Sequence, residues 1–334
     1  MKNNIISRRN FIKISAVAGS MLVGGKLLFD LAKDEFFTVK ESRLLMGTII
    51  NLAVVAESKS AGEAAVEATF TELERQVGIF THRTTESPLA VLNRTGKLAN
   101  PPLELVEVLY QAMAISEMTK GAFDVTIKPL LDLYQQSQPE LPGPDVVESA
   151  LNLVDYTQVS FSSEQISFRQ PGMAITLDGI AKGYIVDAGT DVLTKMGFKN
   201  VYVEAGGDLM ASGKKEGKTP WRIGIRSPRE NVPGLLANVS IENQGVATSG
   251  DYFQAFSSDF SNHHIIDPHT GYSSPELASV SIIAPTVAAA DSLATAVMVM
   301  GKEGLELVEE LPLCEAYIVT KGGLVFNTAG FNLG

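Results

Sequence analysis

The chain has 334 residues, of which 45% are hydrophobic and 19% charged, a composition typical of a globular protein with a sizeable core. Its net charge of −11 argues against nucleic acid as a partner, because a phosphate backbone needs a basic binding surface. The single cysteine, Cys314, excludes an internal disulfide and a cysteine-rich metal site.

The N-terminus predicts an export signal, which we assign to residues 1–32. Residues 7–13 read S-R-R-N-F-I-K and precede about a dozen small or apolar residues, fewer than the roughly 20 that a membrane span needs. The paired arginines resemble a twin-arginine signal and predict export to the periplasm or to the outer side of the inner membrane. A basic helix on a cytoplasmic domain is the alternative. No clear A-x-A cleavage site follows, so an uncleaved signal could also serve as a membrane tether.

Helices and strands are mixed in the predicted elements that follow. Residues 44–56 read as one strand that Gly47 interrupts, and the apolar spacing over 61–77 predicts a helix. Pro101-Pro102 open a second helix, and the loop of residues 136–144 is expected to separate two structural units.

Beyond this loop, short apolar runs alternate with turns. They predict strands at 174–177, 200–204, 221–225, 245–248 and 278–283, and two strands about a Lys-Gly-Gly turn near the C-terminus. Helices are predicted over about 181–196 and 288–300, each ended by a glycine. Because no regular βαβ rhythm is visible, we predict an α+β fold, with one domain over 40–334.

The stretch A-D-S-L-A-T-A at 290–296 carries a pair of oxygen ligands. Asp291 and Thr295 are four residues apart in a predicted helix, so their side chains leave the same face. A carboxylate and a hydroxyl are hard oxygen ligands of the kind that Mg²⁺ prefers, often together with a substrate phosphate. Solvated or capping side chains are the alternative interpretation of such a pair.

Five further segments combine glycines and polar groups, and each has a plain structural alternative. In L-D-G-I-A-K-G, residues 177–183, the backbone at a helix start and Lys182 would suit a phosphate, or the glycines serve the helix start alone. G-A-F-D-V-T-I-K-P-L at 121–130 reads as strand-like, with an Asp that either binds a planar ligand or lies on the surface. V-E-A-G-G-D-L at 203–209 and V-A-T-S-G-D-Y at 246–252 would line a ligand site or form turns.

The fifth segment, H-H-I-I-D-P-H-T-G at 263–271, holds three of the four histidines. A neutral imidazole is a suitable base at neutral pH. The spacing lacks the H-x-x-x-H pattern and so does not favour zinc. A turn is the alternative role for the segment.

Together these motifs resemble the ApbE family, the FAD:protein FMN transferases. The resemblance rests on G-A-F-D-V-T, I-A-K-G-Y-x-V-D, G-G-D, A-T-S-G-D-Y, H-I-I-D-P-x-T-G and A-D-S-L-A-T-A in this order, with M-G-T at 46–48 and S-P-L-A-V-L-N at 87–93. It runs from about residue 43 to the C-terminus. It implies an α+β fold with a T-fold-like core and FAD in a cleft between subdomains.

The resemblance also implies a set of site residues. Mg²⁺ would be held by the carbonyl oxygen of Ala181, the carboxylate of Asp291 and the hydroxyl of Thr295. The catalytic groups would be His264, Asp291 and Lys182. FAD would contact Met46, Gly47, Thr48, Ala122, Phe123, Asp124, Asp178, Lys182, Gly206, Gly207, Asp208, Ser249, Gly250, His264 and Ile265. Two positions depart from the family pattern or vary within it: Arg83 stands near the place of a common aromatic residue, and the residue at Asp178 varies.

The implied reaction attaches FMN from FAD through a phosphoester bond to a threonine of a target flavoprotein and releases AMP. The expected acceptors are flavin-bearing subunits of membrane redox complexes. Hydrolysis of FAD to FMN and AMP would use the same ligands, and a non-catalytic exported flavin-binding protein is the third possibility.

Overall fold

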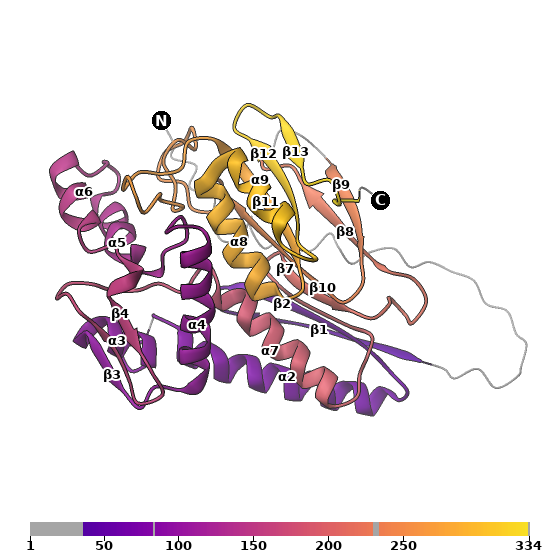
Figure 1. Ribbon diagram of the computed structural model, residues 1–334. Coiled ribbons are helices and arrows are strands. Elements are labelled where there is room, and N and C mark those ends of the chain that lie inside the picture. The colour runs from indigo at the N-terminus through magenta and orange to yellow at the C-terminus, as the bar shows by residue number, and fades with distance from the viewer. Residues whose placement is uncertain (1–35, 83, 230–233, 333–334) are drawn as a thin grey trace, which may run out of the picture.

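The structure is a computed structural model that describes residues 36–82, 84–229 and 234–332. Residues 1–32, assigned to the signal, and Arg83 lie outside these ranges. An antiparallel sheet of eight strands forms the centre of the described chain, in the order β1-β2-β6-β7-β10-β11-β12-β13 (Figure 1). The strands are β1 (Phe37–Leu45), β2 (Thr48–Ala56), β6 (Val201–Ala205), β7 (Asp208–Ser212), β10 (Gln244–Gly250), β11 (Leu277–Ala284), β12 (Glu315–Thr320) and β13 (Val325–Asn327).

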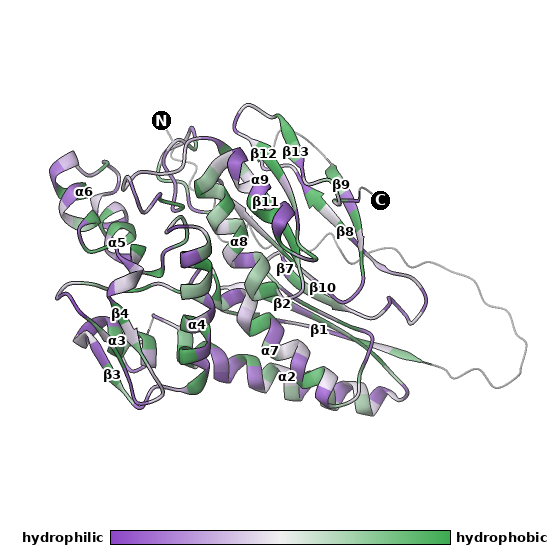
Figure 2. Ribbon diagram, viewed as in Figure 1, coloured by the Kyte–Doolittle hydropathy of each residue, from purple (hydrophilic) through white to green (hydrophobic). Residues whose placement is uncertain are grey.

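Three helices cover one face of this sheet: α2 (Lys59–Phe80), α7 (Ala181–Lys195) and α8 (Val287–Met300) (Figure 1). Alternate residues of the strands point to these helices and form the main core with them, because successive side chains of a strand point to opposite faces of the sheet. Two short elements, η4 (Gly301–Glu303) and α9 (Gly304–Glu310), follow α8. Every residue of β11 is buried, and Figure 2 shows hydrophobic colour on this strand and on the elements around it.

The opposite face is covered by a two-stranded ribbon, β8 (Trp221–Arg226) and β9 (Leu235–Ile241). Trp221 and Val239 of this ribbon pack in a second core with Leu209 and Tyr317 of the central sheet. The central strands are therefore buried on both sides, which explains their apolar runs.

A smaller unit lies beside the sheet and the helix layer (Figure 1). It contains α3 (Pro88–Thr95), α4 (Leu103–Met118), α5 (Lys128–Ser137) and α6 (Pro144–Leu151), the small sheet β3-β5-β4 (Lys97–Ala99, Gln165–Phe168, Val159–Phe161), and the 3₁₀ turns η2 (Val125–Ile127) and η3 (Tyr156–Gln158). The loop 136–144, expected to separate two units, instead joins α5 to α6, which pack on each other. No helix among the described residues is long and apolar enough to span a membrane.

The predicted α+β class is confirmed, and three predictions of local secondary structure are also wrong. Residues 44–56 are not one strand, because Met46 and Gly47 adopt positive φ angles of 56° and 77° and form the two-residue turn between β1 and β2. Residues 174–177 pair with no strand, since the backbone of Ile175 is satisfied by the side chain of Asn93. The strand-like run after Gly121 forms η2 and the start of α5.

Candidate functional site

The starts of α7 and β7 and the middle of α8 bring three charged residues together. Nζ of Lys182 lies 2.5 Å from Oδ2 of Asp208, whose side chain is only 1% exposed. Asp291, 4% exposed, accepts a hydrogen bond at Oδ2 from the backbone N–H of Gly183 at 3.1 Å. Lys182 and Asp291 are more than a hundred residues apart in the sequence, and Asp208 lies between them, so only the packing of α7 against α8 and the sheet brings the three groups together.

The electrostatics of this cluster leave it short of positive charge. Burial opposes the charge of Lys182, but the carboxylates of Asp208 and Asp291 outweigh it and raise the pKa of the ammonium above its usual range. Burial raises the pKa of Asp291 to about 7, although Lys182 acts in the opposite direction. Two buried carboxylates thus share one ammonium group, an arrangement that an added cation would stabilise.

Thr295 adds a hydroxyl beside the cluster. Its Oγ1 lies 3.3 Å from Oγ of Ser249, at the end of β10. A Cβ atom at Gly179 would lie 3.1 Å from the same hydroxyl and 3.1 Å from the ring of Phe123, so the absence of a side chain there keeps this hydroxyl open. Because Gly179 adjoins Thr295 and Gly183 binds Asp291, the segment 179–183 runs alongside both predicted metal ligands of α8.

The donor set present here fits a divalent cation. It offers a buried carboxylate at Asp291, the hydroxyl of Thr295 and the main chain around Ala181, all oxygen groups of the type Mg²⁺ prefers. Among the described residues, no three His, Cys, Asp or Glu side chains are grouped so that they could hold a metal ion by themselves.

Two glycine-containing turns, Met46-Gly47 and Gly206-Gly207, lie next to each other at one end of the sheet. Gly206 and Gly207 form the two-residue turn between β6 and β7, with φ angles of 61° and 107°. The N–H of Gly206 donates to the carbonyl of Ile49, and a Cβ atom on Gly206 would lie 2.7 Å from Oγ1 of Thr48. The predicted cofactor segments 46–48 and 206–208 therefore lie side by side, and Asp208 connects them to Lys182.

His264 carries a buried ring nitrogen that has no hydrogen-bond partner. This atom is Nδ1, while the backbone N–H of His264 donates to the carbonyl of Gln254. Burial and then the neighbouring His263 lower the pKa of its imidazole to about 4; Lys182 acts in the same direction, whereas Asp178 raises the pKa. The ring is therefore neutral at pH 7. The next residue, Ile265, is buried in the main core.

The other two histidines of the segment have structural contacts. Nε2 of His263 donates to the carbonyl of Ser274 at 3.0 Å, and its Nδ1 accepts from the N–H of Ile265. His269 contacts Asp267 and the carbonyl of Lys120. The clustered histidines thus divide into two that fix the loop and one, His264, that is left open.

Asp124 and Asp178 occupy different environments. The Asp124 carboxylate accepts from the N–H and hydroxyl of Thr126 and from the N–H of Tyr156, so its side chain caps η2 and ties it to η3. Asp178 is largely exposed, and its carboxylate lies 4.0 Å from Nδ1 of His82. Flavin contact by either residue stays a prediction.

Two aspartates near the cluster make contacts that the sequence analysis did not predict. Asp187 on α7 accepts hydrogen bonds from the N–H groups of Val287 and Ala288 on α8. Asp251, directly after Gly250 and fully buried, forms a bidentate ion pair with Arg229 at 2.8 and 2.9 Å. Both aspartates belong to quoted motifs, but their partners are distant in sequence, and no local signal identifies them.

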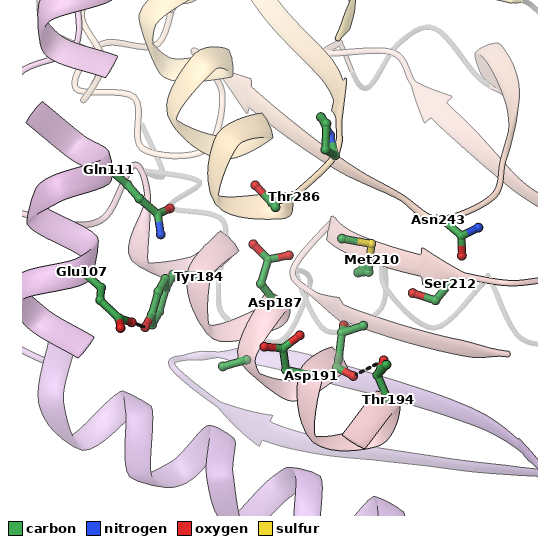
Figure 3. A pocket seen from close by; sticks show the side chains of 13 residues that line it. Glu107, Gln111, Tyr184, Asp187, Asp191, Thr194, Met210, Ser212, Asn243 and Thr286 are labelled. Carbon is green, nitrogen blue, oxygen red and sulfur yellow. Dashed lines mark hydrogen bonds between the residues drawn. The ribbon is translucent and has the colours of Figure 1, made fainter. Parts of the chain in front are cut away.

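A cavity of about 450 Å³ lies on the other side of Asp187, apart from the predicted metal and flavin residues (Figure 3). It opens between α4, α7, β7 and the start of α8, with Glu107, Tyr184, Asp187, Asp191 and Thr286 among its lining residues. None of the predicted metal or flavin residues lines it.

The fold and the cluster define an α+β protein with a buried acidic centre beside two glycine-containing turns, a chemistry that suits a cation and a phosphorylated ligand. The profile of the ApbE family matches residues 46–318. The chain is 31% identical over 312 residues to a protein of Treponema pallidum and 29% identical over 333 residues to one of Haemophilus influenzae, both named FAD:protein FMN transferase. These matches cover 86% of each chain for the first relative, and 92% of this chain and 94% of the relative for the second.

Solved structures agree. The structure of an ApbE protein from Thermotoga maritima superposes with a TM-score of 0.78 at 31% identity, covering 88% of this chain and 97% of that one. The flavin transferase ApbE from Vibrio cholerae gives 0.79 at 25% identity, covering 89% and 98%. This chain belongs to the ApbE family, as the motif order predicted.

Proposed function

We propose that this chain is a Mg²⁺-dependent FAD:protein FMN transferase, which joins FMN to a threonine of an acceptor protein and releases AMP. The observation that carries the proposal is the buried cluster of Lys182, Asp208 and Asp291 beside the hydroxyl of Thr295. The name shared by relatives that match most of the chain supports the same activity.

The metal would be held by the carbonyl oxygen of Ala181, the carboxylate of Asp291 and the hydroxyl of Thr295. When bound, the cation supplies Lewis-acid stabilisation of charge on the pyrophosphate oxygens. Lys182 adds a second positive charge at the same place, and its raised pKa keeps it charged at every working pH.

In the proposed reaction, the threonine oxygen of the acceptor attacks the phosphorus on the FMN side of FAD. The bond from this phosphorus to the bridging oxygen breaks, AMP leaves with that oxygen, and a phosphoester forms. His264 takes the proton of the hydroxyl, because its imidazole is neutral and Nδ1 has no partner. The negative charge of a bound diphosphate raises the pKa of this imidazole and strengthens it as a base.

The proposal extends to place and partner. We propose export by the twin-arginine route and acceptors in membrane redox complexes, supported by the S-R-R-N-F-I-K sequence at residues 7–13.

The test incubates the full chain with FAD, Mg²⁺ and an exported candidate acceptor, followed by a denaturing gel viewed under ultraviolet light. We expect a fluorescent acceptor band and release of AMP, and we expect Asp291→Ala to lower the rate about 100-fold or more. Exposed Asp191 provides the control, since Asp191→Asn removes a carboxylate from α7 outside the cluster. AMP and free FMN without a labelled acceptor would indicate hydrolysis, and bound FAD without AMP would indicate a flavin-binding protein. Wild-type transfer by Asp291→Ala would contradict the metal assignment.

A further inference from the structure

We propose that Asp187 is a positioning residue that fixes α8 against α7 and thereby sets the affinity for the divalent cation. The inference rests on the proposed function for the location of the metal site. It concerns a side chain that touches neither the flavin residues nor the metal ligands named above.

The carboxylate of Asp187 caps a helix other than its own. Oδ1 accepts from the N–H of Val287 and Oδ2 from the N–H of Ala288, both at 2.9 Å. The first turn of α8 contains no acidic residue. The side chain of Thr286 accepts only from the N–H of Ala289, so α7 supplies both the acceptors for two orphan N–H groups and the negative charge that favours a helix N-terminus.

A second contact lies one turn away on the same face of α7. Gly183 and Asp187 are four residues apart, so both point toward α8. The N–H of Gly183 binds Oδ2 of Asp291, and a Cβ atom on Gly183 would lie only 2.4 Å from the carbonyl oxygen of Val287. The two helices therefore meet at successive turns, which fixes both their separation and their relative position along the axis.

This double contact controls the proposed metal site because the ligands come from both helices. Ala181 belongs to the first turn of α7, whereas Asp291 and Thr295 belong to α8. The contact through Gly183 limits how closely the helices approach. The bonds from Asp187 oppose a slide or tilt of α8 that would move Asp291 and Thr295 away from Ala181.

The surroundings of Asp187 provide a matched control and a rescue variant. In Figure 3 its side chain points toward Thr286 at the start of α8, and Asp191 lies one turn further along α7. Asp191 lines the same cavity, but its carboxylate forms an ion pair, at 3.8 Å, with Lys195 of its own helix. The cavity of about 450 Å³ leaves room for the additional methylene of a glutamate at position 187.

The experiment compares Asp187→Asn with wild type and with Asp191→Asn. The asparagine keeps one acceptor oxygen but turns an NH₂ group toward the second N–H of α8. Mn²⁺ serves as the probe, and the electron paramagnetic resonance signal of free Mn²⁺ gives the dissociation constant, with and without FAD. The measurement is made at pH 8, because burial raises the pKa of Asp187 to about 6 and the carboxylate is then ionised.

We expect Asp187→Asn to bind Mn²⁺ about tenfold more weakly, the lower end of the effect found for groups that hold metal ligands in place. Asp191→Asn should bind like wild type, and Asp187→Glu should recover most of the affinity. In the transfer assay, Asp187→Asn should need about tenfold more Mg²⁺ for half-maximal rate, with kcat at saturating Mg²⁺ close to wild type.

A second variant approaches the contact from α8. Val287→Pro removes the N–H group that donates a hydrogen bond to Oδ1 of Asp187. Val287 is the first residue of α8, a position where proline is tolerated. It should also weaken Mn²⁺ binding, and it keeps the test available if Asp187→Asn does not fold.

Three results would overturn the inference. The first is an unchanged Mn²⁺ affinity in Asp187→Asn, with only a lower unfolding midpoint. The second is an equal loss of Mn²⁺ affinity in Asp187→Asn and Asp191→Asn, and the third is no Mn²⁺ binding by the wild-type chain. A wild-type chain that binds Mn²⁺, shows the Asp187→Asn deficit and transfers no FMN would instead refute the proposed function alone.

Discussion

The substitution Gly183→Ala tests how closely α7 and α8 must approach. A Cβ atom at this position would lie 2.4 Å from the carbonyl oxygen of Val287 and 2.7 Å from the Cα of Ala288. Both are backbone atoms, so no change of rotamer relieves the clash. The helices must separate by about 1 Å to restore ordinary contact.

The structure gives a magnitude for the effects on stability and on activity. Overpacking of this kind costs about 1–3 kcal/mol, and the better helix propensity of alanine offsets about 1 kcal/mol. The free energy of unfolding should therefore fall by roughly 0–2 kcal/mol, which leaves the protein folded. Activity should fall about 100-fold, because a displacement of about 1 Å moves Gly183 and Asp291 out of their 3.1 Å contact.

Urea unfolding measures the first quantity, and the rate of FMN transfer at saturating FAD and Mg²⁺ measures the second. Gly189→Ala is the matched control on the same helix. Its Cβ would meet the side chains of Leu73 and Thr69, at 2.9 and 3.3 Å, which can move aside. A wild-type transfer rate in Gly183→Ala would refute the argument that this close approach positions the site.

Two further predictions concern charge. Because the pKa of His264 is lowered from 6.5 to about 4 in the folded chain, the unfolded state binds the extra proton between these values. The free energy of unfolding should therefore decrease as pH falls from about 6.5 to about 4, by up to about 3 kcal/mol, and His264→Asn should flatten this slope in urea titrations at several pH values. An identical slope in the variant would contradict the burial of a neutral ring. Lys182→Met should destabilise the chain by about 3 kcal/mol, because the carboxylate of Asp208 stays buried without its partner, whereas Lys182→Arg should retain most of the stability in the same measurement.

The sequence alone determined the family and most of the secondary structure. Helix spacing predicted α2, α7 and α8 closely, because their apolar faces are local signals, as are the glycines that follow α7 and α8. The ordered motifs predicted the α+β class and the ApbE family, and the comparisons confirm both. The N-terminal signal and the roles of individual site residues stay predictions.

Local sequence patterns gave a wrong prediction where the hydrogen-bond partners of a segment come from a distant part of the chain. Residues 174–177 look like a strand, but the Asn93 side chain occupies the hydrogen-bonding positions of Ile175, a contact across 82 residues. The turn at Met46-Gly47 was missed because a methionine with positive φ is uncommon in such turns.

The tertiary structure decided which polar residues share one place. The sequence supplied Lys182, Asp208 and Asp291 as separate candidates, but only helix packing against the sheet brings them together and leaves two carboxylates facing one ammonium. It also showed that His263 is held by Ser274 while Nδ1 of His264 is left open. Burial and long-range contacts depend on the whole chain, and for that reason neither the charge balance of the site nor the cap that Asp187 places on α8 follows from spacing.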